Sequence, residues 1–161
     1  MTGAYRELRV PTTAVEAEIL STDGRTFVGR VFVPDVSALH SGPMRAAEWL
    51  NDSALFFPFR PSDGSGSVLL NRNEVLVFTV AAGDDGEGKE IDEAGGVRRR
   101  VIVECRDRTF EGDIVIDMPP HLSRVSDYLN GPDRFLIVRG ENRHHLIRKA
   151  RITRVIEPKE T

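Results

Sequence analysis

The amino-acid sequence contains one pattern twice, and this internal repeat is the feature that most constrains the fold. Three segments recur in the same order: Arg25–Gly29 returns as Arg108–Gly112, Arg45–Asn51 as Arg124–Asn130, and Leu69–Val75 as Leu146–Ile152. The offset falls from 83 to 79 to 77 residues because the first copy carries small loop insertions. Recurrence of several segments in one order predicts two structurally equivalent units.

The repeat divides the 161-residue chain into five predicted parts. We expect an N-terminal tail at 1–14, a first copy at 15–80, an acidic glycine-rich linker at 81–97, a second copy at 98–157 and a C-terminal tail at 158–161. A unit of about 65 residues is near the lower limit for an independent hydrophobic core. Each copy is therefore expected to rely on a neighbour for its stability.

Alternation of apolar and polar residues predicts five short strands in each copy. They are expected at 15–20, 25–33, 55–60, 67–71 and 74–80, and again at 100–105, 108–116, 134–139, 143–148 and 151–156. After the second strand of each copy, residues 44–51 and 122–130 predict one or two helical turns. Short antiparallel strands bent at a glycine are typical of a small barrel. The expected fold is therefore mainly β, with two tandem five-stranded barrels.

Charge is distributed unevenly, although the whole chain has a formal net charge of only -3. Residues 1–80 carry 7 basic and 9 acidic side chains, residues 81–97 carry 1 and 6, and residues 98–161 carry 14 and 10, which gives -2, -5 and +4. A basic second copy could bind an anionic partner through one face, because physiological salt screens the electric field of charges that lie further away. The overall acidity disfavours binding to nucleic acid.

The composition is that of a folded soluble protein, with 40% hydrophobic and 29% charged residues. No apolar run approaches the ~20 residues that cross a bilayer, and residues 1–11 lack the pattern of a signal peptide. Cys105 is the single cysteine, and its position on the apolar face of a predicted strand indicates a core residue in a reducing compartment. We therefore expect a cytoplasmic protein that contacts no membrane.

Features of the second copy resemble the Sm-like fold of Hfq and LSm proteins. They are Gly112 in the bent second strand, the R-x-S-D-x-L-N segment with Asp127 and Asn130, and the basic turn Arg148–Lys149. The segment is also similar to one shared by an uncharacterised bacterial family of Sm-like domains. The resemblance covers nearly the whole of each copy. It implies two Sm-like small barrels, each with a short helical insertion after strand two, and favours the second copy if RNA is bound.

Basic side chains near the end of the second copy are the candidate nucleic-acid site. Arg148, Lys149, Arg151 and Arg154 could hold phosphates, with Tyr128 as a stacking platform for single-stranded RNA. The alternative is that the four cations are solvent-facing strand residues and that Tyr128 is buried, since basic strand faces are common.

The recurrent helical segment is predicted to be structural. Arg124 and Asp127, and likewise Arg45 and Glu48, lie three residues apart and are expected to form ion pairs within each helix. The recurring asparagines, Asn51 and Asn130, are expected to end the helices through local hydrogen bonds to the backbone.

Residues that would carry enzymatic or metal chemistry are missing from the sequence pattern. His144 and His145 are adjacent on a predicted strand, so their side chains point to opposite faces and cannot both bind one ion. No Ser-His-Asp or Cys-His arrangement is present. We expect a non-enzymatic protein with no metal and no cofactor.

Two functions of different classes follow. The first is an assembly or protein-interaction module that pairs with a protein partner or with itself through exposed strand edges. The alternative is an RNA-binding protein of the Sm or Hfq type, in which several chains form a pseudo-symmetric ring whose basic second copies hold single-stranded RNA. A sensor of the cyclic dinucleotide c-di-GMP ranks last, because no Asp-x-Ser-x-x-Gly element follows Arg98–Arg100.

Overall fold

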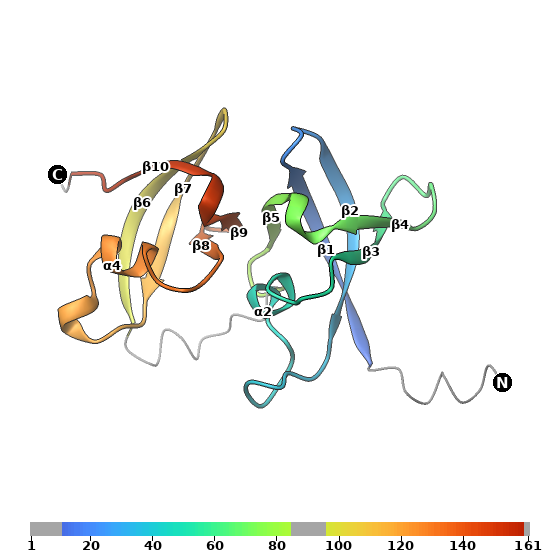
Figure 1. Cartoon of the computed structure of the whole chain (residues 1–161), viewed down its shortest axis with the longest axis horizontal. Helices are drawn as coiled ribbons and strands as arrows, with labels where there is room; N and C mark the ends of the chain where they lie inside the picture. Colours follow the sequence, from blue (N-terminus) through green and yellow to red (C-terminus); the bar gives the residue numbers. More distant parts are fainter. Residues whose placement is uncertain (1–10, 85–95, 160–161) are drawn as a thin grey trace.

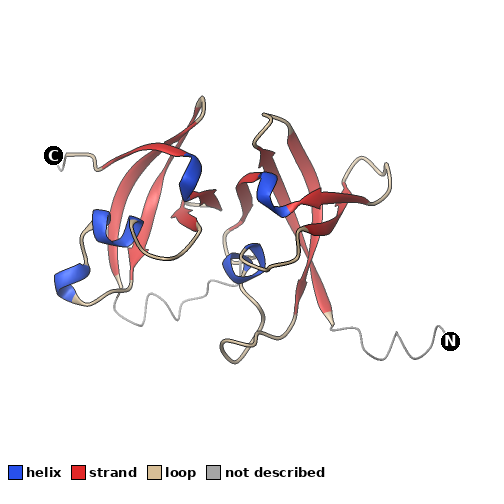
Figure 2. Ribbon diagram, viewed as in Figure 1, coloured by secondary structure: helices blue, strands red, loops and turns tan. Residues whose placement is uncertain are grey.

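The structure is a computed structural model that describes residues 11–84 and 96–159. Within these residues the predicted mainly β fold is confirmed (Figures 1 and 2). The first copy forms β1 (Thr12–Ser21), β2 (Thr26–Pro34), β3 (Phe56–Pro61), β4 (Val68–Asn71) and β5 (Val75–Ala81). The second forms β6 (Val97–Cys105), β7 (Arg108–Ile116), β8 (Phe135–Arg139), β9 (Arg143–Arg148) and β10 (Ile152–Ile156). Most of the predicted linker, at 85–95, lies outside the described residues.

Short helices occupy equivalent places in the two copies. Helix α2 (Ala46–Leu50) follows β2, and α4 (Val125–Leu129) follows β7. The 3₁₀ turns η1 (Arg72–Glu74) and η3 (Lys149–Arg151) join the fourth strand of each copy to the fifth, and η2 (Pro120–Leu122) precedes α4. The sequence pattern predicted no helix at η1 or η3, because a single 3₁₀ turn is too short to produce a helical pattern.

One antiparallel sheet runs through both copies. Its strand order is β10-β6-β7-β8-β9-β5-β1-β2-β3-β4, so the fifth strand of the first copy, β5, pairs with the fourth strand of the second, β9. The order does not return to its start, and among the described residues neither β10 nor β4 has a second partner strand. The arrangement as two barrels therefore stays a prediction.

The recurring glycine of the Arg-Thr-Phe segment lets the long second strand cross the third. A Cβ atom on Gly29 would lie 2.2 Å from the carbonyl oxygen of Arg60, and one on Gly112 would lie 2.5 Å from that of Arg139. Ladder pairing at the crossings is short: β7 pairs with β8 only between Asp113 and Arg139. The glycine is required by this close approach of two backbones.

Replacing Gly112 with alanine is expected to lower the free energy of unfolding by about 1–3 kcal/mol, because the new methyl group must displace backbone atoms of β8. Urea denaturation of both proteins measures the change. The neighbouring Glu111→Ala variant is the control, since Glu111 is exposed and its ion pair with Arg100 contributes at most about 1 kcal/mol. Equal stability of the Gly112→Ala variant and the unchanged protein would contradict the crossing.

Two hydrophobic cores cross the boundary between the copies. The first core surrounds Trp49, Phe57 and Phe78 of the first copy but also contains Phe135 and Leu146 of the second. The second core is built largely from the second copy and takes in side chains of the first, namely Leu20, Leu76 and Val77. Each small unit thus completes the core of the other, which supplies the neighbour that a unit of this size needs.

Candidate functional site

The pairing of β5 with β9 joins the first sequence copy to the second, and we call it the internal junction. Its central pairs are Val77 with Ile147, Phe78 with Leu146, and Thr79 with His145. The hydroxyl of Thr79 and Nδ1 of His145 share a hydrogen bond of 2.8 Å. All six of these residues except His145 are buried, so the junction is a closely packed seam.

The guanidinium of Arg148 fastens the second copy onto the first. Its Nε donates a hydrogen bond to the carbonyl oxygen of Val75 and its Nη2 donates one to that of Arg72, both at 2.8 Å. The group also lies 4.7 Å from the centre of the Phe135 ring. Partial burial lowers the pKa of Arg148. This predicted phosphate-binding residue therefore already has two carbonyl acceptors inside the chain.

The two open strands are the repeat counterparts of the two strands in the internal junction. The fourth strand of the first copy, β4, is the counterpart of β9, and the fifth strand of the second copy, β10, is the counterpart of β5. Figure 1 shows β4 and β10 on opposite sides of the molecule. The fourth strand is thus paired in one copy (β9) and open in the other (β4), and the fifth strand is likewise paired as β5 and open as β10. The two open strands form the candidate site.

The β4 edge exposes apolar side chains that the internal junction buries. Leu69 is 68% exposed, whereas its counterpart Leu146 is 0% exposed. Phe56 on the adjoining β3 is 54% exposed, whereas its counterpart Phe135 is 4% exposed. A shallow pocket of about 320 Å³ lies beside them and is also lined by Phe27. Contiguous exposed apolar side chains of this kind mark interaction sites.

The β10 edge has a complementary hollow. A pocket of about 370 Å³ is lined by Val125 and Leu129 of α4 and by Val155 of β10, with Arg99 and Arg124 among its other lining residues. The first-copy counterparts of the three apolar residues, Ala46, Leu50 and Phe78, belong to the first core, which receives Phe135 and Leu146 across the internal junction. The hollow therefore corresponds to the space that the other copy fills in the first core.

The other face of the β10 edge carries an ion pair where the internal junction is apolar. Arg154 donates from Nε and Nη2 to the two carboxylate oxygens of Glu104, at 2.9 and 2.7 Å. The hydrogen bonds from Arg154 lower the pKa of Glu104. Val77, the counterpart of Arg154, and Leu20, the counterpart of Glu104, are buried in the second core. Arg154 was predicted to hold phosphate, and the structure places it in this ion pair.

Lys149 and Tyr128 lie together, as the RNA hypothesis requires, but so do their counterparts in the first copy. The ammonium of Lys149 lies 5.5 Å from the centre of the Tyr128 ring and donates to the carbonyl oxygen of Tyr128 at 3.4 Å. In the first copy, Arg72 lies 4.5 Å from the centre of the Trp49 ring and donates to the carbonyl oxygen of Trp49 at 2.6 Å. A contact that recurs in both copies is explained by attachment of the helix to the sheet. Of the predicted cations, Arg151 and Arg154 are exposed.

The helical segments differ between the copies. In the second, Nε of Arg124 lies 3.0 Å from Oδ2 of Asp127, and the backbone N–H of Asn130 ends α4 by donating to the carbonyl oxygen of Ser126. In the first, the N–H of Asn51 donates to Ala47 and Glu48 in the same way. The carboxylate of Glu48, the counterpart of Asp127, contacts the loop between β2 and α2.

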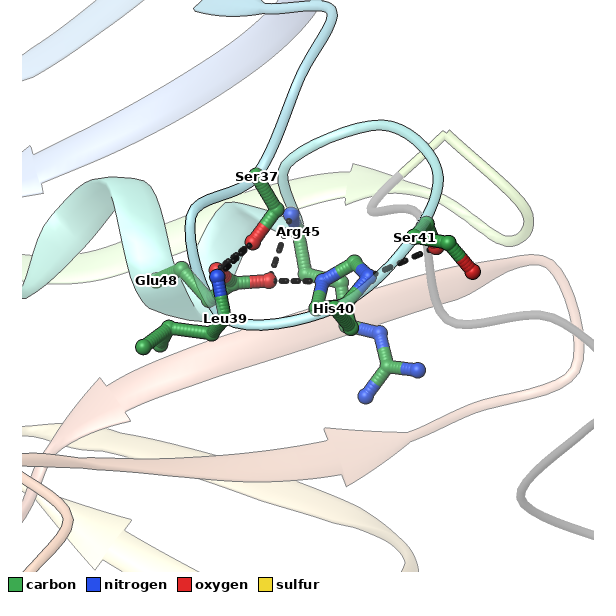
Figure 3. Close-up of polar contacts among 6 residues, drawn as sticks. All are labelled: Ser37, Leu39, His40, Ser41, Arg45 and Glu48. Carbon is green, nitrogen blue, oxygen red and sulfur yellow. Dashed lines mark hydrogen bonds and ion pairs between the residues drawn. The ribbon is translucent and has the colours of Figure 1, made fainter.

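Glu48 organises the loop between β2 and α2 (Figure 3). Its carboxylate accepts a hydrogen bond of 2.6 Å from the hydroxyl of Ser37, one of 3.2 Å from the backbone N–H of Arg45, and a contact from Nε2 of His40. Nδ1 of His40 lies 3.0 Å from the carbonyl oxygen of Ser41. The carbonyl oxygen of Ser41 and the carboxylate of Glu48 both accept hydrogen bonds. The imidazole ring of His40 therefore donates to both when its two nitrogens are protonated. The sequence signal for this loop was its four extra residues relative to the second copy.

The pKa shifts of His40 and Glu48 predict that this loop stabilises the protein most over an intermediate pH range. The hydrogen bond to Ser41, followed by that to Glu48, raises the pKa of His40 above its ordinary 6.5, so its stabilisation is complete below pH 6.5 and is lost as the pH rises. Burial raises the pKa of Glu48, but hydrogen bonds from Ser37, His40 and Arg45 outweigh it and hold the pKa below 4.5. The stabilisation by Glu48 is therefore lost only as the pH falls below 4.5.

We expect the unchanged protein to be more stable than a His40→Gln variant at about pH 5.5, with a difference that shrinks toward about pH 8.5. Urea denaturation across this range measures it. The pKa of His145 is lowered, first by burial, and gives a pH dependence of the opposite sign. That contribution cancels in the comparison because both proteins contain His145. A difference that does not vary with pH would contradict a charged His40.

The part of the chain that the structure describes contains neither a metal-binding cluster nor a membrane-spanning helix. No group of three or more potential metal-ligating side chains forms there. The described helices are all too short to cross a bilayer. Comparison with family models, curated proteins and solved structures gives no match.

Proposed function

We propose that this chain is a non-enzymatic protein-assembly module, built from two Sm-like halves, that adds a strand of a protein partner at its open sheet edges. The observation that carries the proposal is the exposure of Leu69 and Phe56 on and beside β4, where the counterparts in the internal junction are buried. A copy of this fold therefore buries these positions when it is joined, and the first copy leaves them open.

The chemistry of β4 favours the addition of a strand. Open strands present unpaired backbone N–H and C=O groups to a partner, and natural edges are usually protected by charged side chains or proline. The sequence of β4, Val68-Leu69-Leu70-Asn71, contains neither. Hydrogen bonds along the backbone would supply affinity, and the pocket beside Phe56 would supply selectivity.

Single-stranded RNA binding has weaker support. The second copy remains the basic one, with a net charge of +4 over residues 98–161. Yet Arg148, Lys149 and Arg154 all donate hydrogen bonds within the chain. An RNA phosphate would have to compete with these acceptors for the three side chains.

The experiment is photo-crosslinking in the cells that naturally produce the protein. A photoreactive amino acid replaces Leu69 in one variant and Val36 in another, because Val36 is almost equally exposed, at 64%, but lies in the loop before α2. We expect a discrete protein adduct at Leu69 and none at Val36. The absence of an adduct at Leu69, or equal adducts at both positions, would overturn the proposal.

A further inference from the structure

We propose that the first copy carries a binding site for a small organic anion, a molecule with a carboxylate or phosphate group on an apolar body. The site is a pocket of about 520 Å³ in the part of the sheet where β1 lies between β2 and β5. Small-molecule sites have volumes of about 300–1,000 Å³. The described residues that line the pocket include none of β4 or β10, so the inference goes beyond the proposed function and does not depend on it.

Two arginines that line this pocket lie directly opposite each other in the sheet. Arg30 of β2 is the register partner of Arg60 of β3, beside the crossing where Gly29 pairs with Pro61. Directly opposite side chains share one face of a sheet, with Cβ atoms about 4.5–5.5 Å apart, and like charges at this spacing destabilise the pairing. An oxyanion bound between the two guanidinium groups removes that repulsion and accepts hydrogen bonds from both.

The acidic side chains near the arginine pair do not neutralise it. Oε1 of Glu16 lies 3.7 Å from Nη2 of Arg30, and both side chains are mostly exposed, so this ion pair is weak. The carboxylate of Glu18 is held by Arg143 of β9, whose Nη1 lies 3.2 Å from Oε2. Arg60 forms no ion pair with any side chain in the described ranges. The pair therefore retains positive charge that an anionic ligand can meet.

The second copy arranges the equivalent row of charges differently. Asp113 of β7 pairs in register with Arg100 of β6 on one side and with Arg139 of β8 on the other, so a carboxylate separates two cations. The first copy has the charges of the first two positions exchanged, in the order Glu16, Arg30 and Arg60. The exchange puts two cations side by side, which disfavours the strand pairing unless an anion binds there. This difference indicates a site in the first copy alone.

The pocket is apolar beside the arginine pair. Val28 is 54% exposed and lies two residues before Arg30, so the two side chains share one face of β2. Pro61 also lines the pocket. The second-copy counterpart of Val28 is Glu111, which makes the equivalent surface acidic. A ligand whose anionic group binds Arg30 and Arg60 therefore covers Val28 with its apolar body.

Titration of the purified full-length protein, followed by NMR at low salt, tests the site with naphthoate, naphthyl phosphate and the neutral naphthamide. We expect both anions to shift the backbone N–H signals of Val28, Arg30 and Arg60. Both should bind at least about tenfold more tightly than naphthamide, because hydrogen bonds between ions are the stronger ones. Inorganic phosphate should bind more weakly than naphthyl phosphate, since it leaves Val28 uncovered. The relative affinities of naphthoate and naphthyl phosphate show which anionic group the site prefers.

Two variants locate the binding. Arg60→Gln should weaken the binding of both anions by about tenfold or more. The matched control is Arg25→Gln, because Arg25 also lies over a phenylalanine ring but does not line this pocket. The second variant, Glu16→Arg/Arg30→Asp, copies the charges of the second-copy row and leaves the net charge of the chain unchanged. It should weaken binding as much as Arg60→Gln does, which excludes an effect of overall charge.

Far-UV circular dichroism shows whether each variant folds, and we expect all to fold because residues 16, 25, 30 and 60 are exposed. Equal affinity for naphthamide and the anions, or unchanged binding by folded Arg60→Gln protein, overturns the inference. The absence of binding by every probe up to about 10 mM also overturns it. Strand addition at β4 is measured separately, by crosslinking at Leu69, so failure of this inference leaves the proposed function standing.

Discussion

Replacing Leu146 with alanine is expected to lower the free energy of unfolding by about 2–5 kcal/mol. Leu146 belongs to the second copy, yet it is fully buried in the first core, close in the sheet to Phe78 of β5. Truncation leaves a cavity in the core of the other copy. Because the cores share residues, we expect both copies to unfold together in a single transition.

Trp49, the only tryptophan of the chain, reports on this coupling because it lies in the first core. Its fluorescence and the far-UV circular dichroism of the whole chain should give the same midpoint in urea, displaced equally by Leu146→Ala. The control is Leu69→Ala, at the exposed counterpart of Leu146, which should change stability by no more than about 0.5 kcal/mol. Both variants are measured at the same low protein concentration. A Trp49 midpoint that Leu146→Ala leaves unchanged would contradict the shared core.

Local patterns were sufficient to predict the strands. The alternation in Arg108–Ile116 and in Arg143–Arg148 predicted β7 and β9 with the bounds that the structure shows. Such alternation reports which side chains face a core, and the intervening turns have characteristic compositions. The order of the strands was not predictable in this way, because the pairing of Val77 with Ile147 joins residues far apart in the chain.

One sequence signal does distinguish the joined strand from the open one. Residues 75–80, Val-Leu-Val-Phe-Thr-Val, are almost continuously apolar, which is typical of a strand covered on both faces. The counterpart, residues 152–157, reads Ile-Thr-Arg-Val-Ile-Glu and includes polar residues. This difference between the copies indicates that β5 lies inside the sheet and β10 at its edge.

The candidate site was harder to predict than the fold, because a basic residue has the same sequence pattern whether it binds a phosphate or a carbonyl oxygen. Comparison of the copies carries more information. Lys149 aligns with Arg72, and Tyr128 aligns with Trp49, so a cation and an aromatic ring recur together. A pairing that survives divergence of the charges around it favours a structural role, which mutation can test.

Replacing Arg72 with methionine is expected to lower the free energy of unfolding by about 2–4 kcal/mol. Arg72 is buried, and donates from Nη1 to the carbonyl oxygen of Trp49 at 2.6 Å and from Nε to that of Ala54 at 2.7 Å. Methionine fills a similar volume and removes a charge whose burial is costly, which acts in its favour. It leaves both carbonyl oxygens without this donor, and we expect that loss to dominate.

The counterpart variant, Lys149→Met, is the matched control. The ammonium of Lys149 is less buried and makes a single contact of 3.4 Å to the carbonyl oxygen of Tyr128, so its loss should cost about 1 kcal/mol or less. The free energy of unfolding of Arg72→Lys should also be well below that of the unchanged protein. An ammonium cannot reproduce the planar guanidinium, which spans the two carbonyl oxygens and lies over Trp49. Urea denaturation compares the three variants. Equal losses for Arg72→Met and Lys149→Met would show that burial of the cation, rather than its two hydrogen bonds, decides the stability of α2 against the sheet.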